Sequence, residues 1–207
     1  MNVCGTKDGG HRNEPENCLE RRIREVFHNR NVRRIPWTSD LTRAAVLIPL
    51  LKRDGAYHVL FTRRSDTVRH HKGEISFPGG AHDRTDRDLL STALREAEEE
   101  IGVKAEDVEV LGCLDEVVTM SDFLVSPYVG MIPYPYAFMI SPEEIAELII
   151  LPLRCFFKYN AAENYRTYGQ KTGKVYVYEC GEYVVWGATA KILSGLVDLL
   201  CRDGAIR

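Results

Sequence analysis

The segment from residue 89 to residue 102 combines a strong helical pattern with a dense run of acids, and any fold must satisfy both. Its glutamates fill four of five consecutive positions, namely Glu96, Glu98, Glu99 and Glu100. Its apolar side chains recur every three to four residues, namely Leu90, Ala93, Leu94, Ala97 and Ile101. This spacing predicts one amphipathic helix that buries its apolar side in a core and keeps an acidic side at the edge of that core.

A helical projection at about 100° per residue separates the four glutamates. With Glu96 at zero, Glu99 falls at about −60° and Glu100 at about +40°, so these three carboxylates share one face, whereas Glu98 points toward solvent. Like charges at this spacing cost only about 0.2–0.5 kcal/mol per pair on an exposed helix. A solvated acidic face is therefore one interpretation. The other is a site for a divalent cation such as Mg²⁺, which prefers carboxylate oxygens and keeps water ligands for phosphates.

Composition and charge exclude several classes of function. A chain of 207 residues with a net charge of −3 at pH 7 can bury a substantial core, and it does not suit a protein held to nucleic acid by phosphate contacts. The longest apolar run, residues 44–51, is too short to span a bilayer. The six cysteines show no Cys-x-x-Cys spacing, which favours an intracellular, reducing compartment, cytoplasm or organelle matrix. We expect neither a nucleic-acid nor a membrane partner.

The remaining patterns predict the order of the elements. We expect residues 1–14 to be disordered and residues 15–207 to form a single domain. The predicted elements are a helix that begins near Pro15, a β-hairpin that turns at Asp54-Gly55, strands at 108–118 and 124–134, a helix at 142–149 with Ser141 as its N-cap, a hairpin near Gly181 and a helix at 188–201. Strands interleaved with a few helices indicate an α/β (α+β) fold, with a mixed sheet between helices.

Two adjacent motifs resemble the signatures of a known superfamily. The stretch REAEEEIGV, residues 95–103, is similar to the second half of the Nudix box, Arg-Glu-apolar-x-Glu-Glu-x-Gly-apolar. The stretch before it, residues 60–80, resembles the additional signature of the coenzyme A pyrophosphatase branch of the Nudix hydrolases. Phe61 stands where that signature has its second leucine, and the residues in register are Thr62, Arg64, Ser65, Arg69, Gly73, Phe77, Pro78, Gly79 and Gly80. The resemblance implies a Nudix-like mixed β-sheet sandwiched between α-helices.

The first half of the box departs from the family pattern Gly-x5-Glu-x7-Arg-Glu. Arg87 stands where the first glutamate belongs, and Ala81 stands where the glycine belongs. Asp86 or Asp88 must then supply the missing acid. The helical projection favours Asp88, because it falls on the Glu99 side of the acidic face.

The resemblance implies a specific reaction, the metal-dependent hydrolysis of the diphosphate of coenzyme A or its thioesters. The products would be 3′,5′-ADP and 4′-phosphopantetheine or its acyl form. Glu96, Glu99 and Glu100 match the metal-binding and catalytic positions of the family, with Mg²⁺ or Mn²⁺ as the metal. The match also implies that Arg95 is structural and orients a glutamate, and that Gly102 forms the left-handed cap of the helix.

The branch signature also implies contacts with the substrate. The residues that it assigns to substrate binding are Arg64, Arg69, Phe77, Gly79 and Gly80. Guanidinium groups suit a ligand with several phosphates, because they donate two hydrogen bonds to each. For Arg64 and Arg69, a solvated position or an ion pair within the protein is also open. Glycines let the backbone approach a ligand closely. For Phe77, a place in the pocket wall and a place in the core are both open.

Several alternatives stay open at the level of the sequence. The general base is one of three downstream carboxylates, Glu116, Glu144 or Glu147. The same fold could act on ADP-ribose or on NADH-type dinucleotides, which also carry a diphosphate. Because the first acid of the box is displaced, a Nudix-like module that binds nucleotides without cleaving them is another alternative. A solvated acidic helix in an ordinary α/β domain predicts no metal dependence. The oligomeric state, monomer or homodimer, is open as well.

Overall fold

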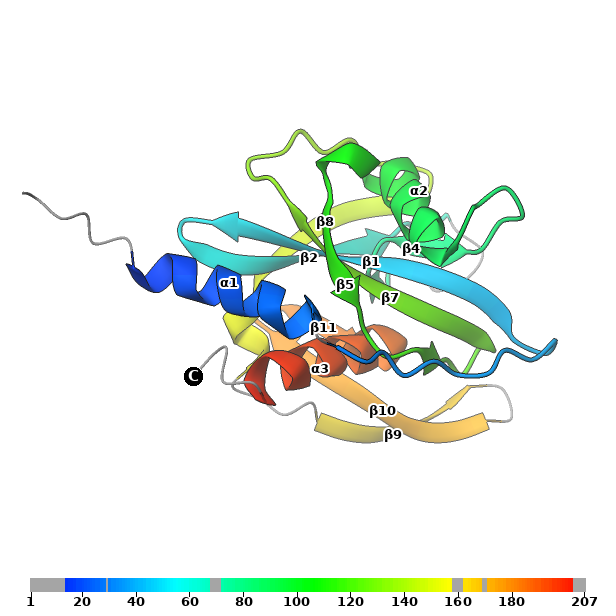
Figure 1. The fold of residues 1–207 in the computed structure, drawn as a ribbon. Helices are drawn as coiled ribbons and strands as arrows, with labels where there is room; N and C mark the ends of the chain where they lie inside the picture. Colours follow the sequence, from blue (N-terminus) through cyan, green and yellow to red (C-terminus); the bar gives the residue numbers. More distant parts are fainter. Residues whose placement is uncertain (1–13, 29, 68–71, 158–161, 169–170, 203–207) are drawn as a thin grey trace, which may run out of the picture.

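The computed structural model describes residues 14–28, 30–67, 72–157, 162–168 and 171–202. A large mixed sheet lies between helix α2 (Leu89–Ile101) on one face and helices α1 (Glu14–His28) and α3 (Gly187–Arg202) on the other (Figure 1). This arrangement confirms the predicted Nudix-like sheet sandwiched between helices. The expected disorder of residues 1–14 falls outside the described residues except for Glu14, which begins α1.

The large sheet contains eight strands within the described part of the chain. They are β1 (Thr42–Arg53), β2 (Ala56–Arg64), β3 (Ile75–Ser76), β4 (Gly79–Ala81), β5 (Glu109–Cys113), β6 (Val117–Val118), β7 (Phe123–Ile132) and β8 (Ile145–Pro152). The main order is β3-β2-β1-β7-β5, with β4 paired to β1, β6 to β7 and β8 to β2. The central pair, β1 with β7, is parallel, and the other pairs are antiparallel.

The predicted hairpin between β1 and β2 is confirmed. Arg53 pairs with Ala56 across a two-residue turn. Both turn residues, Asp54 and Gly55, have positive φ angles, 51° and 75°. A turn with two positive φ angles matches the right-handed twist of the strands, and an Asp-Gly pair adopts it readily.

The predicted helix at 142–149 is wrong, because these residues lead into strand β8. The Ser141 carbonyl accepts from the N–H groups of Glu144 and Ile145 at 3.0 and 2.8 Å, as in a single helical turn, but the chain then extends. From Ile145 on, β8 pairs with β2 along its length. Ile145, Ile149 and Leu151 are buried, and their even spacing places them on one face of a strand. Tertiary pairing therefore overrides a local helix-start signal.

The other strand predictions are confirmed with adjustments. The run 108–118 contains two strands, β5 and β6, and a register shift between Val110 and Gly112 interrupts the pairing of β5 with β7. The run 124–134 corresponds to β7. Short 3₁₀ helices occur at Ala105–Asp107 and Leu153–Phe156.

A second sheet of three antiparallel strands lies beside α3 (Figure 1). It consists of β9 (Ala162–Tyr168), β10 (Lys171–Cys180) and β11 (Tyr183–Trp186). The predicted hairpin near Gly181 joins β10 to β11, and the predicted C-terminal helix is α3. Strand β9 was not expected, because its sequence AENYRTY has no clear alternation of apolar and polar residues.

Two apolar cores fix the position of α2. One face of α2, with Ala93, Ala97 and Ile101, packs against Ala45 and Leu47 of β1. The other core lies on the far face of the sheet, under α1 and α3, and includes the following side chains: Ile23, Phe27, Ile48, Phe61, Leu193 and Leu196. Helix α2 therefore presents its remaining faces at the edge of the sheet. None of the helices in the described ranges is long and apolar enough to cross a membrane.

Candidate active site

Both ends of α2 are capped by the residues next to it. At the N-terminus, the Asp88 side chain accepts a hydrogen bond from the Ser91 N–H at 2.8 Å. At the C-terminus, Gly102 has a left-handed conformation with φ 72°, and its N–H donates to the Glu98 carbonyl at 3.0 Å. Only glycine adopts this φ without strain. The predicted role of Gly102 as a left-handed cap is thus confirmed, and the cap ends the acidic helix after Ile101.

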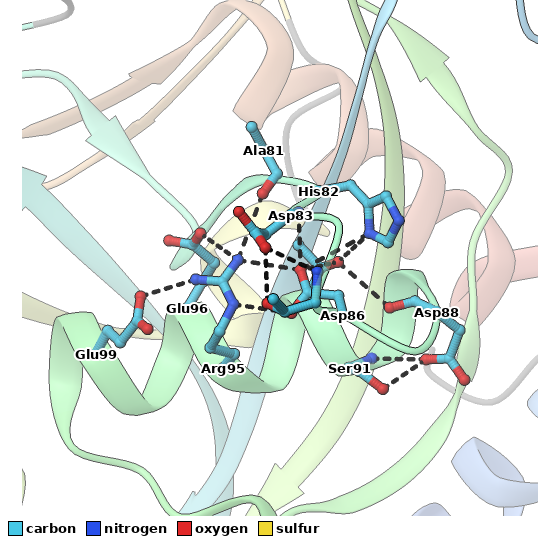
Figure 2. Close-up of polar contacts among 11 residues, drawn as sticks. Ala81, His82, Asp83, Asp86, Asp88, Ser91, Arg95, Glu96 and Glu99 are labelled. Carbon is cyan, nitrogen blue, oxygen red and sulfur yellow. Dashed lines mark hydrogen bonds and ion pairs between the residues drawn. The ribbon is translucent and has the colours of Figure 1, made fainter.

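The structure corrects the choice between the two candidate acids of the box. Asp88 was favoured, but it is the exposed cap of the helix and lies away from the other acids (Figure 2). Asp86 lies next to Arg95, with a side chain only 4 % exposed, and also accepts a hydrogen bond from the Thr92 hydroxyl at 2.8 Å. The projection failed because Asp86 precedes the helix, so a helical wheel does not describe its position.

Arg95 is the centre of an ionic cluster (Figure 2). Its guanidinium contacts Asp86 at 2.9 Å, Glu96 at 2.9 Å and Glu99 at 2.8 Å. The hydrogen bonds from Arg95 hold the pKa of the Asp86 carboxyl well below its usual range, and the same carboxyl raises the pKa of Arg95. A planar guanidinium presents five N–H donors in a rigid fork, whereas a lysine ammonium has three donors on a flexible stem. The arginine therefore orients glutamates of the acidic face, as the motif predicts.

Glu100 is the most buried acid of the helix. The residue is only 2 % exposed. Burial raises the pKa of its carboxyl to about 8, an effect that the charges of Glu96 and Glu144 reinforce and that the Arg64 guanidinium opposes. Arg64 lies 3.7 Å from the carboxylate, and the Gly79 N–H donates to it at 3.3 Å. A buried carboxylate with so little compensation binds a cation or a proton strongly.

Glu96 packs directly against the glycine pair. Burial raises the pKa of its carboxyl, although contact with Arg95 opposes the increase. A Cβ atom on Gly80 would lie 2.5–2.6 Å from the atoms of the Glu96 carboxylate. Gly80 therefore leaves the space that this carboxylate occupies. Gly79 has a different function, because a Cβ there would meet the backbone of β1 at 2.4 Å from the Ala45 carbonyl oxygen.

The two glycines therefore predict different outcomes when each is replaced by alanine. In Gly80→Ala the new methyl group displaces only the end of a flexible side chain, so the protein stays folded while Glu96 moves and turnover falls. In Gly79→Ala the methyl group clashes with a central strand, and the free energy of unfolding falls by about 1–3 kcal/mol. Urea unfolding together with a turnover assay checks both. A Gly80→Ala enzyme with the wild-type rate would show that the position of Glu96 is unimportant.

The remaining glutamates of the run differ in their surroundings. Glu99 is half exposed and held by Arg95. Glu98 pairs with Lys104 on the solvent side, as the projection predicted. The structure thus separates Glu96, Glu99 and Glu100 from Glu98.

The structure also distinguishes the three candidate bases. Glu116 is buried and accepts hydrogen bonds from the Ile35 N–H at 2.7 Å and the Ser126 hydroxyl at 2.8 Å, on the β7 side of the sheet. Glu147 pairs with Arg63 at 3.1 Å. Glu144 alone of the three is exposed and close enough for its charge to raise the pKa of both Glu96 and Glu100. Sequence reasoning could not select it, because only the folded turn before β8 brings it to the helix.

An open cleft of about 570 Å³ lies next to this turn. Its lining includes Thr67, Pro142, Glu143 and Glu144. The cleft therefore lies between the loop after β2 and the turn before β8.

The remaining substrate-contact predictions have different outcomes. Arg64 lies beside Glu100 and is about a quarter exposed. Arg69 lies outside the described residues. Phe77 is in the core, with its ring stacked on Phe61 at a centroid distance of 4.9 Å, and is only 3 % exposed. In this conformation Phe77 supports the site from behind and does not line an open wall.

The donor chemistry of the site fits a divalent metal ion. Glu96, Glu99 and Glu100 supply hard carboxylate oxygens, and the buried Glu100 gains most from a nearby positive charge. Within the described ranges no three acidic, histidine or cysteine side chains are already close enough together to hold a metal. Figure 2 shows that Glu96 and Glu99 both contact the guanidinium of Arg95.

Comparison with known proteins decides the family. The sequence model of the NUDIX domain matches residues 41–153, more than half of the chain. The chain belongs to the Nudix hydrolase family. The matched region contains the acidic helix α2, the glycine pair and the turn with Glu144, so the candidate site lies within the Nudix domain. The family acts on nucleoside diphosphates linked to another group, and this Nudix hydrolase is accordingly an enzyme.

Relatives and solved structures agree with this assignment. The chain is 40 % identical over 157 residues to the uncharacterized Nudix hydrolase NudL of Pectobacterium atrosepticum, which covers 74 % of this chain and 80 % of that protein. It is 38 % identical over 162 residues to NudL of Citrobacter koseri, covering 77 % and 83 % of the two chains. The crystal structure of a MutT/nudix family protein from Enterococcus faecalis matches with a TM-score of 0.52 at 14 % identity, covering 94 % of this chain and 75 % of that chain, which shows a shared fold.

Proposed function

We propose that this Nudix hydrolase cleaves the diphosphate of coenzyme A or its thioesters, with Mg²⁺ or Mn²⁺ as cofactor. The observation that carries the proposal is the place of the branch signature in the fold. Arg64 and Gly79 of that signature both contact Glu100, and Gly80 packs on Glu96. The segment that resembles the coenzyme A branch therefore lies directly against the acidic face of α2.

Each residue of the site has a proposed task in this reaction. Glu96, Glu99 and Glu100 hold the divalent ions, and Arg95 keeps the first two in orientation. When bound, such ions neutralise the diphosphate and lower the pKa of the attacking water. Arg64, beside Glu100 and partly exposed, is placed to donate hydrogen bonds to a phosphate.

The proposed hydrolysis balances with one water molecule. The water oxygen bonds to one phosphorus of the diphosphate, and the bond from that phosphorus to the bridging oxygen breaks. Glu144 accepts the proton of the water, since it is the exposed carboxylate next to the acidic helix. The bridging oxygen leaves with the second phosphate, which gives 3′,5′-ADP and 4′-phosphopantetheine or its acyl form.

A turnover assay with three related diphosphates tests the proposal. Coenzyme A, 3′-dephospho-coenzyme A and ADP-ribose are each incubated with the enzyme and Mg²⁺, and the products are identified by mass. We expect cleavage of coenzyme A at the diphosphate. We also expect kcat/KM to be about 10- to 100-fold lower without the 3′-phosphate, which is the size of one lost charge-assisted hydrogen bond. If the enzyme cleaves ADP-ribose or an NADH-type dinucleotide but not coenzyme A, that compound takes the place of coenzyme A as the substrate.

The arginines of the signature refine this test. The branch signature assigns Arg69 to the substrate, and we propose that it binds the 3′-phosphate, so Arg69→Met should lower kcat/KM for coenzyme A and leave ADP-ribose unaffected. Because Arg64 lies beside Glu100, Arg64→Met should slow cleavage of every diphosphate. Arg63→Met is the matched control, since Arg63 pairs with Glu147.

A further inference from the structure

Two segments far apart in sequence meet beside the acidic helix through a compact set of hydrogen bonds. The first is the loop that follows β2, residues 65–67, and the second is the turn before β8, residues 141–144. The Ser65 N–H donates to the Glu144 carbonyl at 2.8 Å. The Thr67 hydroxyl donates to the Glu143 carbonyl at 2.9 Å. The loop therefore holds the backbone of the turn at two successive residues.

The hydroxyl groups of Ser65 and Thr67 form a chain of hydrogen bonds in which the donor at each step is defined. Thr67 has a single hydroxyl proton, which it gives to the Glu143 carbonyl, so at the 2.8 Å contact between the two side chains Ser65 is the donor. The Ser65 oxygen in turn accepts from the Thr67 N–H at 3.3 Å. Ser65 is only 8 % exposed. It therefore anchors Thr67, which itself lies at the surface of the cleft.

The same turn is also bound to the end of helix α2. The Ser141 N–H donates to the Glu100 carbonyl at 3.0 Å, and the Ser141 carbonyl accepts from the N–H groups of Glu144 and Ile145 at 3.0 and 2.8 Å. The turn is thus fixed at Ser141 by the helix and at Glu143 and Glu144 by the loop. Glu144 lines the cleft of about 570 Å³.

We propose that Ser65 and Thr67 are positioning residues that hold Glu144 against the acidic face of α2. This inference rests on the proposed function, because it assumes that Glu144 acts with Glu96 and Glu100. It gives Ser65, a member of the branch signature, a task other than contact with the substrate. Thr67 lies outside the residues matched to the signature and completes the same attachment.

Removal of the Thr67 hydroxyl tests the proposal. Thr67→Val keeps the shape of the side chain and deletes the hydrogen bond to Glu143. We expect kcat to fall by about 10- to 100-fold with little change in KM, the usual size of an effect on residues that orient a metal site. Mn²⁺ binding followed by electron paramagnetic resonance should weaken by about 10-fold, because a carboxylate next to the bound ion has moved. Thr67→Ser restores the hydroxyl and should restore most of both.

A matched control exists in another turn. The Thr119 hydroxyl contacts the Ser121 hydroxyl at 3.1 Å and accepts from the Phe123 N–H at 3.1 Å, between β6 and β7. Thr119→Val removes a similar pair of contacts far from Glu144. It should change neither kcat nor Mn²⁺ binding. The thermal unfolding midpoints of both valine variants show whether an effect is a general loss of stability.

A double-mutant cycle with Glu144→Gln shows whether Thr67 acts through Glu144. If it does, Thr67→Val costs little more once Glu144 is neutralised. Additive losses in the double variant, or wild-type kcat and Mn²⁺ affinity in Thr67→Val and Ser65→Ala, overturn the proposal. Failure of the proposed function has a different signature. The wild-type enzyme then cleaves no coenzyme A, while the Mn²⁺ measurements on the same variants still decide the positioning role.

Discussion

Glu100→Gln is expected to abolish turnover in a protein that stays folded. The substitution keeps the shape of the side chain and removes the charge of the most buried carboxylate on α2. If Glu100 holds a metal ion that stabilises the diphosphate in the transition state, kcat falls on the order of 1,000-fold, or about 4 kcal/mol. A steady-state assay at saturating Mg²⁺ measures the loss. Glu98→Gln is the matched control, since Glu98 pairs with Lys104 on the solvent side of the same helix and its variant should keep the wild-type rate.

The stability of the wild-type protein should depend on pH through Glu100, and Glu100→Gln should reduce this dependence. Burial raises the pKa of Glu100 from the ordinary 4.5 to about 8, so the folded protein binds this proton more tightly than the unfolded chain. The free energy of unfolding therefore falls as pH rises from about 4.5 to 8, the window between the two pKa values. Urea unfolding in a chelator at pH 5.5 and 7.5 should show a smaller decrease for Glu100→Gln than for the wild type. Equal slopes, or a wild-type rate in Glu100→Gln, would contradict the assigned role.

Arg95→Met should lower both stability and turnover. The substitution leaves the Asp86 carboxylate, only 4 % exposed, without its main partner, and it releases Glu96 and Glu99 from a shared contact. We expect the free energy of unfolding to fall by about 1.5–3 kcal/mol, the value of hydrogen bonds to charged groups. Turnover should fall by about 100-fold, because two metal-binding side chains lose their orientation. Chemical unfolding and initial-rate kinetics measure the two effects.

Two further variants separate the role of Arg95 from its charge. Arg95→Lys keeps the charge but lacks the rigid fork of five donors that fixes the carboxylates, so it should recover stability in part and turnover less. Arg87→Met removes an exposed arginine that contacts Asp88 and should change neither stability nor turnover.

The pKa of Asp86 lies below its usual value, so the stability that the Arg95–Asp86 pair contributes at neutral pH is lost as pH falls below about 3.8 and the carboxyl takes up a proton. If Arg95→Met keeps the wild-type stability and rate, the ionic cluster around Arg95 supports neither folding nor turnover.

Local patterns were sufficient to predict much of the site. The apolar spacing of residues 89–101 placed three carboxylates on one side of α2 and Glu98 on another, because a helix has a fixed rotation per residue. Gly102 and the Asp54-Gly55 turn were predictable for a similar reason, since positive φ angles select glycine or a short polar residue. In each case the physical cause acts between residues that are close in sequence.

Other features depend on contacts that are distant in sequence. Ser141 and Glu144 have the pattern of a helix start, yet the pairing of β8 with β2 gives a strand. Asp86 reaches Arg95 only because the loop before α2 folds back, and Glu144 reaches Glu100 only through the turn before β8. Such contacts depend on the tertiary fold, which the spacing of residues within one segment does not contain.

The parallel pairing of β1 with β7 bears on the order in which this enzyme matures during synthesis. Residues Thr42 to Leu51 of β1 pair with Phe123 to Ile132 of β7, and α2, which packs on β1, lies between them in sequence. A ribosome therefore releases the acidic helix before its supporting sheet can close, and such non-local pairing is slow. Glu144 emerges later still. The acidic face of α2, its supporting sheet and the turn that carries Glu144 can therefore come together only after residues up to about 152 have left the exit tunnel.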